Sequence, residues 1–236
     1  MTDTTQLGLP LVQAAQAQKH VTVNEALARL DGLVLLSIQS QSLATPPFVV
    51  TEGSCYGVPL GAINEWSGQD GNLAIARNGG WDFATPRRGW RALIVDEGVQ
   101  ALHDGAYWRS GMVTLSPHNA GMALKVAEID HVIGGGTVST TASLIPPNAV
   151  VIGATARVVS AITGTLTSWQ LGNPGAVGRY GAGLGKGSNA FARGVLGQPT
   201  AFYAATPMQL DATGGSFSGG TVRIAVHFLD ISLPDL

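Results

Sequence analysis

The residues best suited to chemistry lie in a glycine-rich stretch, residues 172–194, which reads GNPGAVGRYGAGLGKGSNAFARG. It combines cationic side chains with aromatic rings, and the chain has no Asp or Glu from Val132 to Leu210. Cations on a flexible backbone form charge-assisted hydrogen bonds with anions, and aromatic faces stack on flat rings. The sequence therefore predicts a loop that binds a polysaccharide, especially an acidic one. The predicted ligand-binding residues are Arg179, Tyr180, Lys186, Phe191 and Arg193 in this stretch, and Trp169 and Tyr203 on the strands beside it.

A second interpretation of this stretch stays open, in which its glycines only make turns and the loop packs against a neighbouring subunit. A phosphate-binding loop is not a third, because Gly187 follows Gly185 and Lys186 where the Walker motif needs Ser or Thr.

Catalytic motifs are lacking elsewhere in the sequence. No metal-ligand spacing relates the five histidines, and no Gly-x-Ser-x-Gly nucleophile elbow occurs. Glycoside hydrolysis usually needs two carboxylates, and Asp96, Glu97, Glu128 or Asp130 could supply one only across domains. We therefore expect a protein that is not an enzyme and that needs no metal or cofactor.

A helix near the N-terminus is the element that we expect to attach the protein to something else. From Gln18 to about Ser40, four apolar residues recur at alternating spacings of four and three, which places them on one helical face. They are Val23, Leu27, Leu30 and Val34. The preceding run LGLPL, residues 7–11, is apolar without a helical period, and Pro10 argues against helix there. Such an arm and helix suit docking onto another surface, although they could equally cover the chain's own core. The predicted attachment residues are Leu7, Leu9, Pro10, Leu11, Val23, Leu27 and Leu30.

The rest of the chain is predicted to be mainly β, because it is rich in glycine, poor in charge and full of short apolar alternations. After the arm and helix of residues 1–40, residues 41–110 are expected to form a small Trp-rich β module with turns at Asn78–Gly79 and Asp104–Gly105. We interpret its four tryptophans as core, with exposed stacking platforms as the alternative.

Residues 111–148 are predicted to be a bridge, and residues 149–236 an antiparallel, jelly-roll-like β-sandwich that carries the binding surface. Alternation places two sets of apolar residues on single strand faces. These are Val150, Ile152, Ala154, Ala156 and Val158 in the first strand, and Val222, Ile224, Val226 and Phe228 in the last, where Arg223 and His227 point the other way.

Charge and composition exclude several classes of protein. A formal net charge of −2 does not suit a protein that binds nucleic acid electrostatically. Cys55 is the single cysteine, so an internal disulfide is impossible. Asp3 precedes any basic residue and no long apolar run follows, so we expect synthesis in the cytoplasm without a secretory signal and no insertion into a membrane.

Two N-terminal passages, LGLPLVQAAQAQKHVTVNEALARLD and EGSCYGVPLGAINEWSGQDGNLAIARNGGWDFATPRRGWRALIVDEG, resemble a phage-associated family of unknown function. The family occurs in prophages and in gene transfer agents, the phage-like particles that package host DNA. Its pattern falls on Tyr56, Val58, Pro59, Trp66, Gly68, Ala74, Trp81, Pro86, Gly89 and Trp90. The C-terminal passage from GATARVV to VRIAVHF is similar to the distal domain of the same particle proteins. Cys55 departs from the family, where we expect a polar residue.

The resemblance implies a virion protein at the particle surface, a head spike or fibre that decorates the capsid and adheres to the capsular polysaccharide of the host cell. Its partners would be a capsid or spike-base protein, further copies of itself in a homotrimer, and the cell-surface polysaccharide. The alternatives are a tail or capsid adaptor with no ligand of its own and, by analogy with other phage spikes, a capsule-degrading enzyme. The shared motifs are structural, so they indicate a family better than a mechanism.

Overall fold

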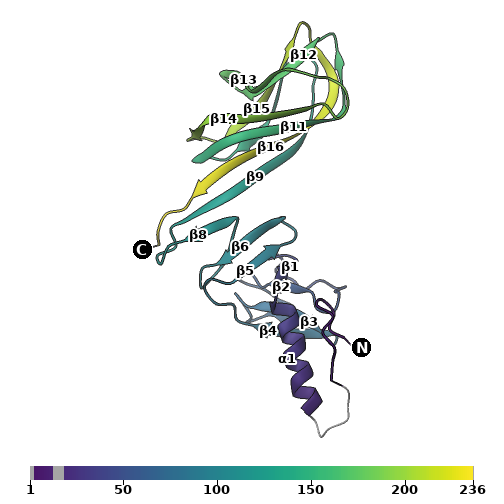
Figure 1. The fold of residues 1–236 in the computed structure, drawn as a ribbon, viewed down its shortest axis with the longest axis vertical. Helices are drawn as coiled ribbons and strands as arrows, with labels where there is room; N and C mark the ends of the chain where they lie inside the picture. The colour runs from purple at the N-terminus through teal and green to yellow at the C-terminus, as the bar shows by residue number, and fades with distance from the viewer. Residues whose placement is uncertain (1–2, 13–18, 236) are drawn as a thin grey trace. The chain divides into compact units, whose positions relative to one another are not determined.

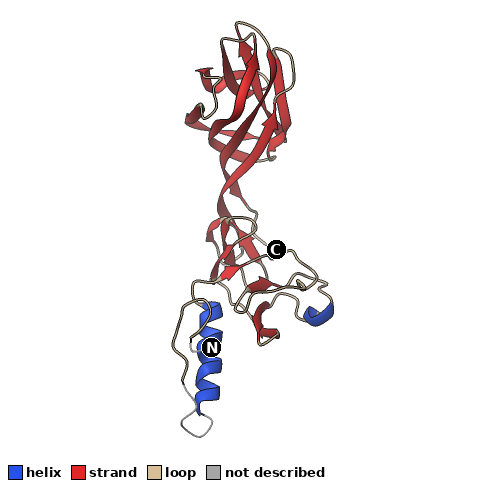
Figure 2. Ribbon diagram, turned by 90° about the vertical axis from the view of Figure 1, so that its right-hand side faces the viewer, coloured by secondary structure: helices blue, strands red, loops and turns tan. Residues whose placement is uncertain are grey.

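The computed structural model describes residues 3–12 and 19–235, which form two compact units. Unit 1 ends at Leu115 and unit 2 begins at Ser116, and each has a hydrophobic core of its own. Strands make up most of the regular structure, and α1 is the one α-helix among the described residues (Figures 1 and 2). The prediction of a mainly β protein with an N-terminal helix is therefore confirmed.

Helix α1 spans Lys19–Leu33, whereas Gln18, where the pattern predicts its start, lies outside the described residues. The predicted end near Ser40 is wrong. Leu35 adopts a left-handed backbone with φ of 52°, which stops the helix and turns the chain into the sheet of unit 1. The other elements of this unit are β1 (Ser37–Ile38), β2 (Cys55–Gly57), the 3₁₀ turn η1 (Asn64–Trp66), β3 (Leu73–Arg77), β4 (Gly80–Ala84), β5 (Arg91–Ile94), β6 (Val99–His103), β7 (Trp108–Ser110) and β8 (Met112–Leu115).

Unit 1 is built on a seven-stranded sheet of order β4-β3-β2-β1-β5-β6-β7. Strand β1 lies at its centre, parallel to both neighbours, and an antiparallel meander flanks it on each side. The turn between β3 and β4 has Asn78 at φ of 50° and Gly79 at 74°, as a type I′ hairpin turn requires. Asp104 and Gly105 occupy the corresponding place between β6 and β7, so both predicted hairpins are confirmed.

The tryptophans of unit 1 belong mainly to its interior. Trp66 is fully buried, and its ring centroid lies 5.6 Å from that of Tyr56 and 5.1 Å from that of Trp81. Trp90 and Trp108 are half-buried against the main core of the sheet. The core interpretation of these residues is confirmed for Trp66, and the other three pack against buried residues without being fully enclosed.

Unit 2 is a β-sandwich of antiparallel strands around one core (Figure 1). One sheet has the order β10-β15-β12-β13, and in the other β14, β11, β16 and β9 are successive neighbours. The strands are β9 (Gly121–Val132), β10 (Val138–Ile145), β11 (Ala149–Gly164), β12 (Ser168–Asn173), β13 (Ala176–Leu184), β14 (Phe191–Phe202), β15 (Thr206–Thr213) and β16 (Phe217–Ile231). The predicted bridge of residues 111–148 is thus wrong, because β9 and β10 are strands of the sandwich itself.

The prediction that residues 172–194 form a long loop is also wrong. Strand β13 occupies Ala176–Leu184 and β14 begins at Phe191. Glycine serves close packing here, since a Cβ on Gly194 would lie 2.2 Å from the carbonyl oxygen of Tyr180. The glycines therefore let two strands approach each other, in addition to making turns.

The face assigned to β11 is only partly right, because the strand pairing shifts between Val151 and Gly153. A β-bulge changes which residues face the core. Val151 is buried and Ile152 is exposed, while Ala154, Ala156 and Val158 point inward as predicted. In β16 the predicted inward residues Val222, Ile224, Val226 and Phe228 are all buried, and Ala225 between them is buried as well.

Candidate functional site

The N-terminal arm is fastened to α1 by one buried carboxylate. Asp31 Oδ1 accepts hydrogen bonds from Thr4 Oγ1 at 2.8 Å and from the Leu7 amide at 2.6 Å. Its Oδ2 accepts one from the Gln6 amide at 2.9 Å. A carboxylate with three donors is well solvated by the protein, so Asp31 can be buried at the foot of the helix.

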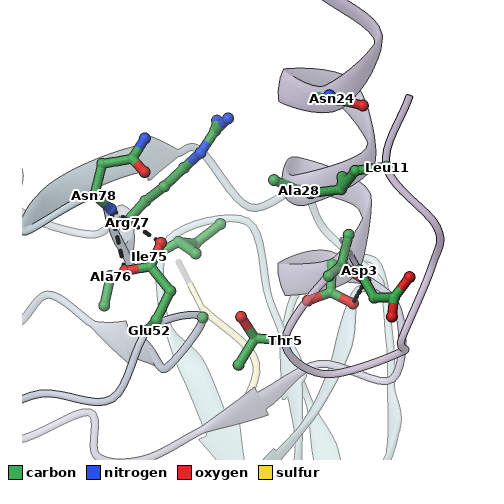
Figure 3. A pocket seen from close by; sticks show the side chains of 13 residues that line it. Asp3, Thr5, Leu11, Asn24, Ala28, Glu52, Ile75, Ala76, Arg77 and Asn78 are labelled. Carbon is green, nitrogen blue, oxygen red and sulfur yellow. Dashed lines mark hydrogen bonds between the residues drawn. The ribbon is translucent and has the colours of Figure 1, made fainter. Parts of the chain in front are cut away.

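A second fastening lies two turns earlier on the same helix. Asn24 Oδ1 accepts from the Val12 amide at 2.8 Å, and Asn24 Nδ2 donates to the Val12 carbonyl at 3.0 Å. Residues seven apart lie on one side of a helix, so Asn24 and Asp31 hold the two ends of the arm along a single line. Figure 3 shows Leu11 of the arm beside Asn24 and Ala28 of the helix.

A pocket of about 320 Å³ lies between the arm, α1 and the end of β3 (Figure 3). Its charged groups already have protein partners: Glu52 accepts from the Asn78 amide at 2.9 Å, and Arg77 pairs with Asp82 at 2.9 Å. In the described part of the chain no group of His, Cys, Asp and Glu could hold a metal ion. The pocket is therefore best understood as the space left where the N-terminal arm packs against the rest of unit 1.

The apolar face of α1 is not used to form the core of unit 1. The helix meets the sheet through its other side, where a Cβ on Gly32 would lie 3.1 Å from the Ile75 side chain. Val23 precedes Gly32 by about two and a half turns and so lies on the far side. Val23, Leu30 and Val34 are 43%, 49% and 40% exposed, and Leu27 is half-buried. We call Val23, Leu27, Leu30 and Val34 the helix stripe.

The predicted attachment residues of the arm lie at the surface. Leu7 and Pro10 are exposed, and Leu9 and Leu11 are half-buried. Val23, Leu30 and Val34 of the helix stripe are exposed as well, so both the arm and the helix of unit 1 present apolar side chains to solvent. The alternative in which arm and helix only bury the chain's own core does not account for these exposed side chains.

Two of the predicted ligand residues are in the core of unit 2. Trp169 is fully buried, with its Nε1 donating to the Gly185 carbonyl at 2.9 Å, and Tyr180 is 2% exposed. Burial also raises the pKa of the Tyr180 hydroxyl. The expectation that these two rings offer a face to a sugar is wrong, because the strands carrying them turn both side chains inward.

The other predicted ligand residues are divided over the surface. Lys186 is half-buried and donates from Nζ to the Leu166 carbonyl at 2.8 Å, and the Arg179 guanidinium lies 5.6 Å from the centre of the Phe202 ring. Phe191, Arg193 and Tyr203 are exposed, and the first two share strand β14. Their predicted role in binding stays a prediction.

Sequence reasoning missed the fastening residues Thr4, Asn24 and Asp31. Asn24 and Asp31 stand three residues before and four residues after Leu27, so a pair of polar residues beside the apolar stripe is the one signal that could have found them. Cys55 is not a reactive thiol. Its side chain is buried, and burial raises the pKa of the thiol to about 12, which keeps it from acting as a nucleophile.

Comparison with known proteins places the similarity in unit 1. A family described as "Protein of unknown function (DUF2793)" has a model that matches part of this chain. Residues 23–109 match it. The matched segment contains most of α1 and nearly all of the seven-stranded sheet.

The other comparisons add little. No curated protein matches the chain. A chain of the solved structure "Cyanophage Pam1 capsid asymmetric unit" aligns with 20% sequence identity and a TM-score of 0.30, over 47% of this chain and 85% of that chain. A likeness this low supports no conclusion about fold or function. No helix in the described residues is both long and apolar enough to span a membrane.

Proposed function

We propose that this protein is a structural component of a phage-like particle, a head spike or fibre, which attaches through the arm and helix stripe of unit 1. The observation that carries the proposal is the exposed helix stripe, because large apolar side chains on a fastened helix gain most from burial against a partner. The resemblance to proteins of prophages and gene transfer agents gives that partner its identity as a capsid or spike-base protein. Further copies of this chain in a homotrimer are the second partner that the resemblance implies.

In this proposal unit 2 supplies the surface that meets the polysaccharide of the host cell. An adaptor without a ligand of its own is the second candidate, and the burial of Trp169 and Tyr180 favours it, since they remove two of the predicted sugar-stacking rings. A capsule-degrading enzyme is the third and has no catalytic constellation in its favour among the described residues.

The test replaces two stripe residues without touching the fold. Val23→Gln together with Leu30→Gln removes apolar surface that would contribute about 1.5–3 kcal/mol per residue if fully buried in an interface. We expect the variant to fold normally and its occupancy on purified particles to fall at least about tenfold. The matched control is Glu25→Gln with Arg29→Gln, two exposed changes on the same helix, which should leave occupancy unchanged.

Full occupancy of the stripe variant would show that attachment lies elsewhere. Deleting residues 1–40 is not an equivalent test, because Leu36 and Ile38 are buried in the core and β1 is the central strand of the sheet. That deletion would unfold unit 1 and abolish assembly for an unrelated reason.

A further inference from the structure

The outer face of one sheet of unit 2 carries charged residues in two adjacent rows. Strand pairing places Phe191, Arg157, Arg223 and Asp130 side by side across β14, β11, β16 and β9. The next row, two residues along each strand, is Arg193, Thr155, Ala225 and Glu128. The residues between the rows, such as Ala156 and Ile224, are buried, so the charged side chains of the two rows point away from the core. Ala225 in the second row is itself buried. We call this surface the arginine face.

Positive charge on this face is not fully neutralised. Arg223 is held by Asp130 through two hydrogen bonds of 2.7 Å, from Nε to Oδ1 and from Nη2 to Oδ2, and Asp130 has a lowered pKa because of these bonds. Arg157 lies directly opposite Arg223, an arrangement of like charges that is unfavourable in a sheet. Within the described residues, the side chains of Arg157 and Arg193 form neither a hydrogen bond nor an ion pair, and their strands carry no acid.

The two unpaired guanidinium groups border a hollow of about 310 Å³. Arg157 and Arg193 occupy diagonal positions on neighbouring strands, which are about 7–8 Å apart in a sheet, so both can reach one ligand. Phe191, which also lines the hollow, is 65% exposed, and the lining residue Thr155 has its Oγ1 3.2 Å from His227 Nε2. Small-molecule sites begin at about this volume.

We infer that the arginine face binds an anionic polysaccharide whose sugars carry carboxylates. Arg157 and Arg193 would each grip a carboxylate through paired N–H donors, and the Phe191 ring would stack on a sugar face. At the other edge of the face Arg223 pairs with both Asp130 at 2.7 Å and Glu128 at 3.9 Å, which leaves one net negative charge there. This charge would repel a continuous polyphosphate, whereas sugar hydroxyls can donate hydrogen bonds to the carboxylates. The mixed charge therefore favours an acidic polysaccharide over a nucleic acid.

This inference rests on the proposed function in one respect, namely that the polysaccharide is located on the surface of a host cell. It moves the binding site from the glycine-rich stretch as a whole to the sheet face that Phe191 and Arg193 share with Arg157. Binding itself can be measured on the purified protein, without any particle.

The experiment measures the affinity of the full chain for polygalacturonate at 0.15 M salt. We expect Arg157→Ala and Arg193→Ala each to weaken binding at least about tenfold, since hydrogen bonds to charged groups are the strong ones. Phe191→Ala should weaken it several-fold. The matched control Arg91→Ala removes an exposed arginine from a strand of unit 1 and should bind as the unchanged protein does. The melting temperature of Arg157→Ala should not fall, because its side chain has no partner to lose.

Three further polymers decide what kind of surface this is. We expect no binding to neutral dextran, and weaker binding to dextran sulfate and to duplex DNA. Equal affinity for dextran would overturn the role of the carboxylate. Equal affinity for dextran sulfate or DNA would show that the arginine face attracts polyanions in general and does not recognise carboxylated sugars. The absence of binding to polygalacturonate would refute the inference. The Val23→Gln, Leu30→Gln variant should still bind polygalacturonate, so the failure of attachment and the failure of this inference can be told apart.

Discussion

Removing the Asp31 carboxylate should release the N-terminal arm from unit 1. In Asp31→Ala three donors lose their acceptor, namely Thr4 Oγ1 and the amides of Gln6 and Leu7. Hydrogen bonds to charged groups contribute about 1.5–3 kcal/mol each, and the low end applies because Gln6 and Leu7 are exposed, which gives an upper limit of about 4–5 kcal/mol. The freed donors can bind water, so we expect a loss of about 2–4 kcal/mol in the free energy of unfolding.

Hydrogen exchange separates this local effect from general damage. The amides of Gln6 and Leu7 should exchange roughly thirtyfold faster or more in Asp31→Ala, as a loss of about 2 kcal/mol requires. Amides in the hairpin of β3 and β4 that exchange through local opening should change much less. Asp31→Asn keeps one acceptor oxygen, so its exchange rates at Gln6 and Leu7 should lie between those of the unchanged protein and those of Asp31→Ala. Asp96→Ala removes an exposed carboxylate from a loop of the same unit and should leave exchange of the arm unchanged.

The reasoning would be refuted by unchanged exchange at Gln6 and Leu7 together with unchanged stability. That result would mean that the arm is held by its apolar residues or by Asn24, and that the carboxylate is incidental. The same variant bears on function, because an arm that has left the helix should also lower the occupancy of the protein on particles.

Two further predictions concern stability. Trp66→Ala should cost about 3–5 kcal/mol because the ring is fully enclosed, whereas Trp90→Ala should cost less because its ring is half-buried; equal urea midpoints for the two variants would contradict this assignment of the core. Burial lowers the pKa of His131 in the folded protein below its ordinary value of about 6.5, so the unfolded chain binds a proton first and stability should fall as the pH drops below about 6.5. Burial lowers the pKa of His103 as well, so His131→Gln should flatten that pH profile only in part in thermal melts, and His118→Gln, at an exposed position, should leave it unchanged.

Local signals in the sequence predicted the local structure well. The Asn78–Gly79 turn specifies its own hairpin because both residues tolerate positive φ, and all four predicted inward residues of β16 between Val222 and Phe228 are buried. The apolar period of α1 also identified the helix stripe correctly as one face. It could not say whether that face is turned inward or outward, because this depends on Gly32 meeting Ile75 from another part of the chain.

The sequence-based predictions that were wrong share a physical cause. In each case contacts between residues far apart in the sequence determined the local structure. Glycines in residues 172–194 suggest a loop, yet Gly194 is needed where β14 passes close to Tyr180. The bulge between Val151 and Gly153 leaves no mark in the apolar pattern, although it reverses which side chain is buried. The arginine face was missed because Arg157 and Arg193, far apart in sequence, become neighbours only when β11 pairs with β14.

The position of strand β1 has a consequence for the order in which unit 1 folds. Ile38 of this strand pairs with β2 on one side, and Ser37 and Ile38 pair with β5 on the other. The Leu93 and Val95 amides donate to the Leu36 and Ile38 carbonyls at 2.9 and 2.8 Å. The two meanders consist of contacts between close neighbours in sequence and can form early, whereas β1 must wait for partners far along the chain. We therefore expect β1 to close the sheet late, so that α1, which leads directly into it, is secured only after both meanders exist. Until that step the helix stripe and the two inner strand edges are open together, which makes late folding the interval in which this unit is most exposed to misassociation.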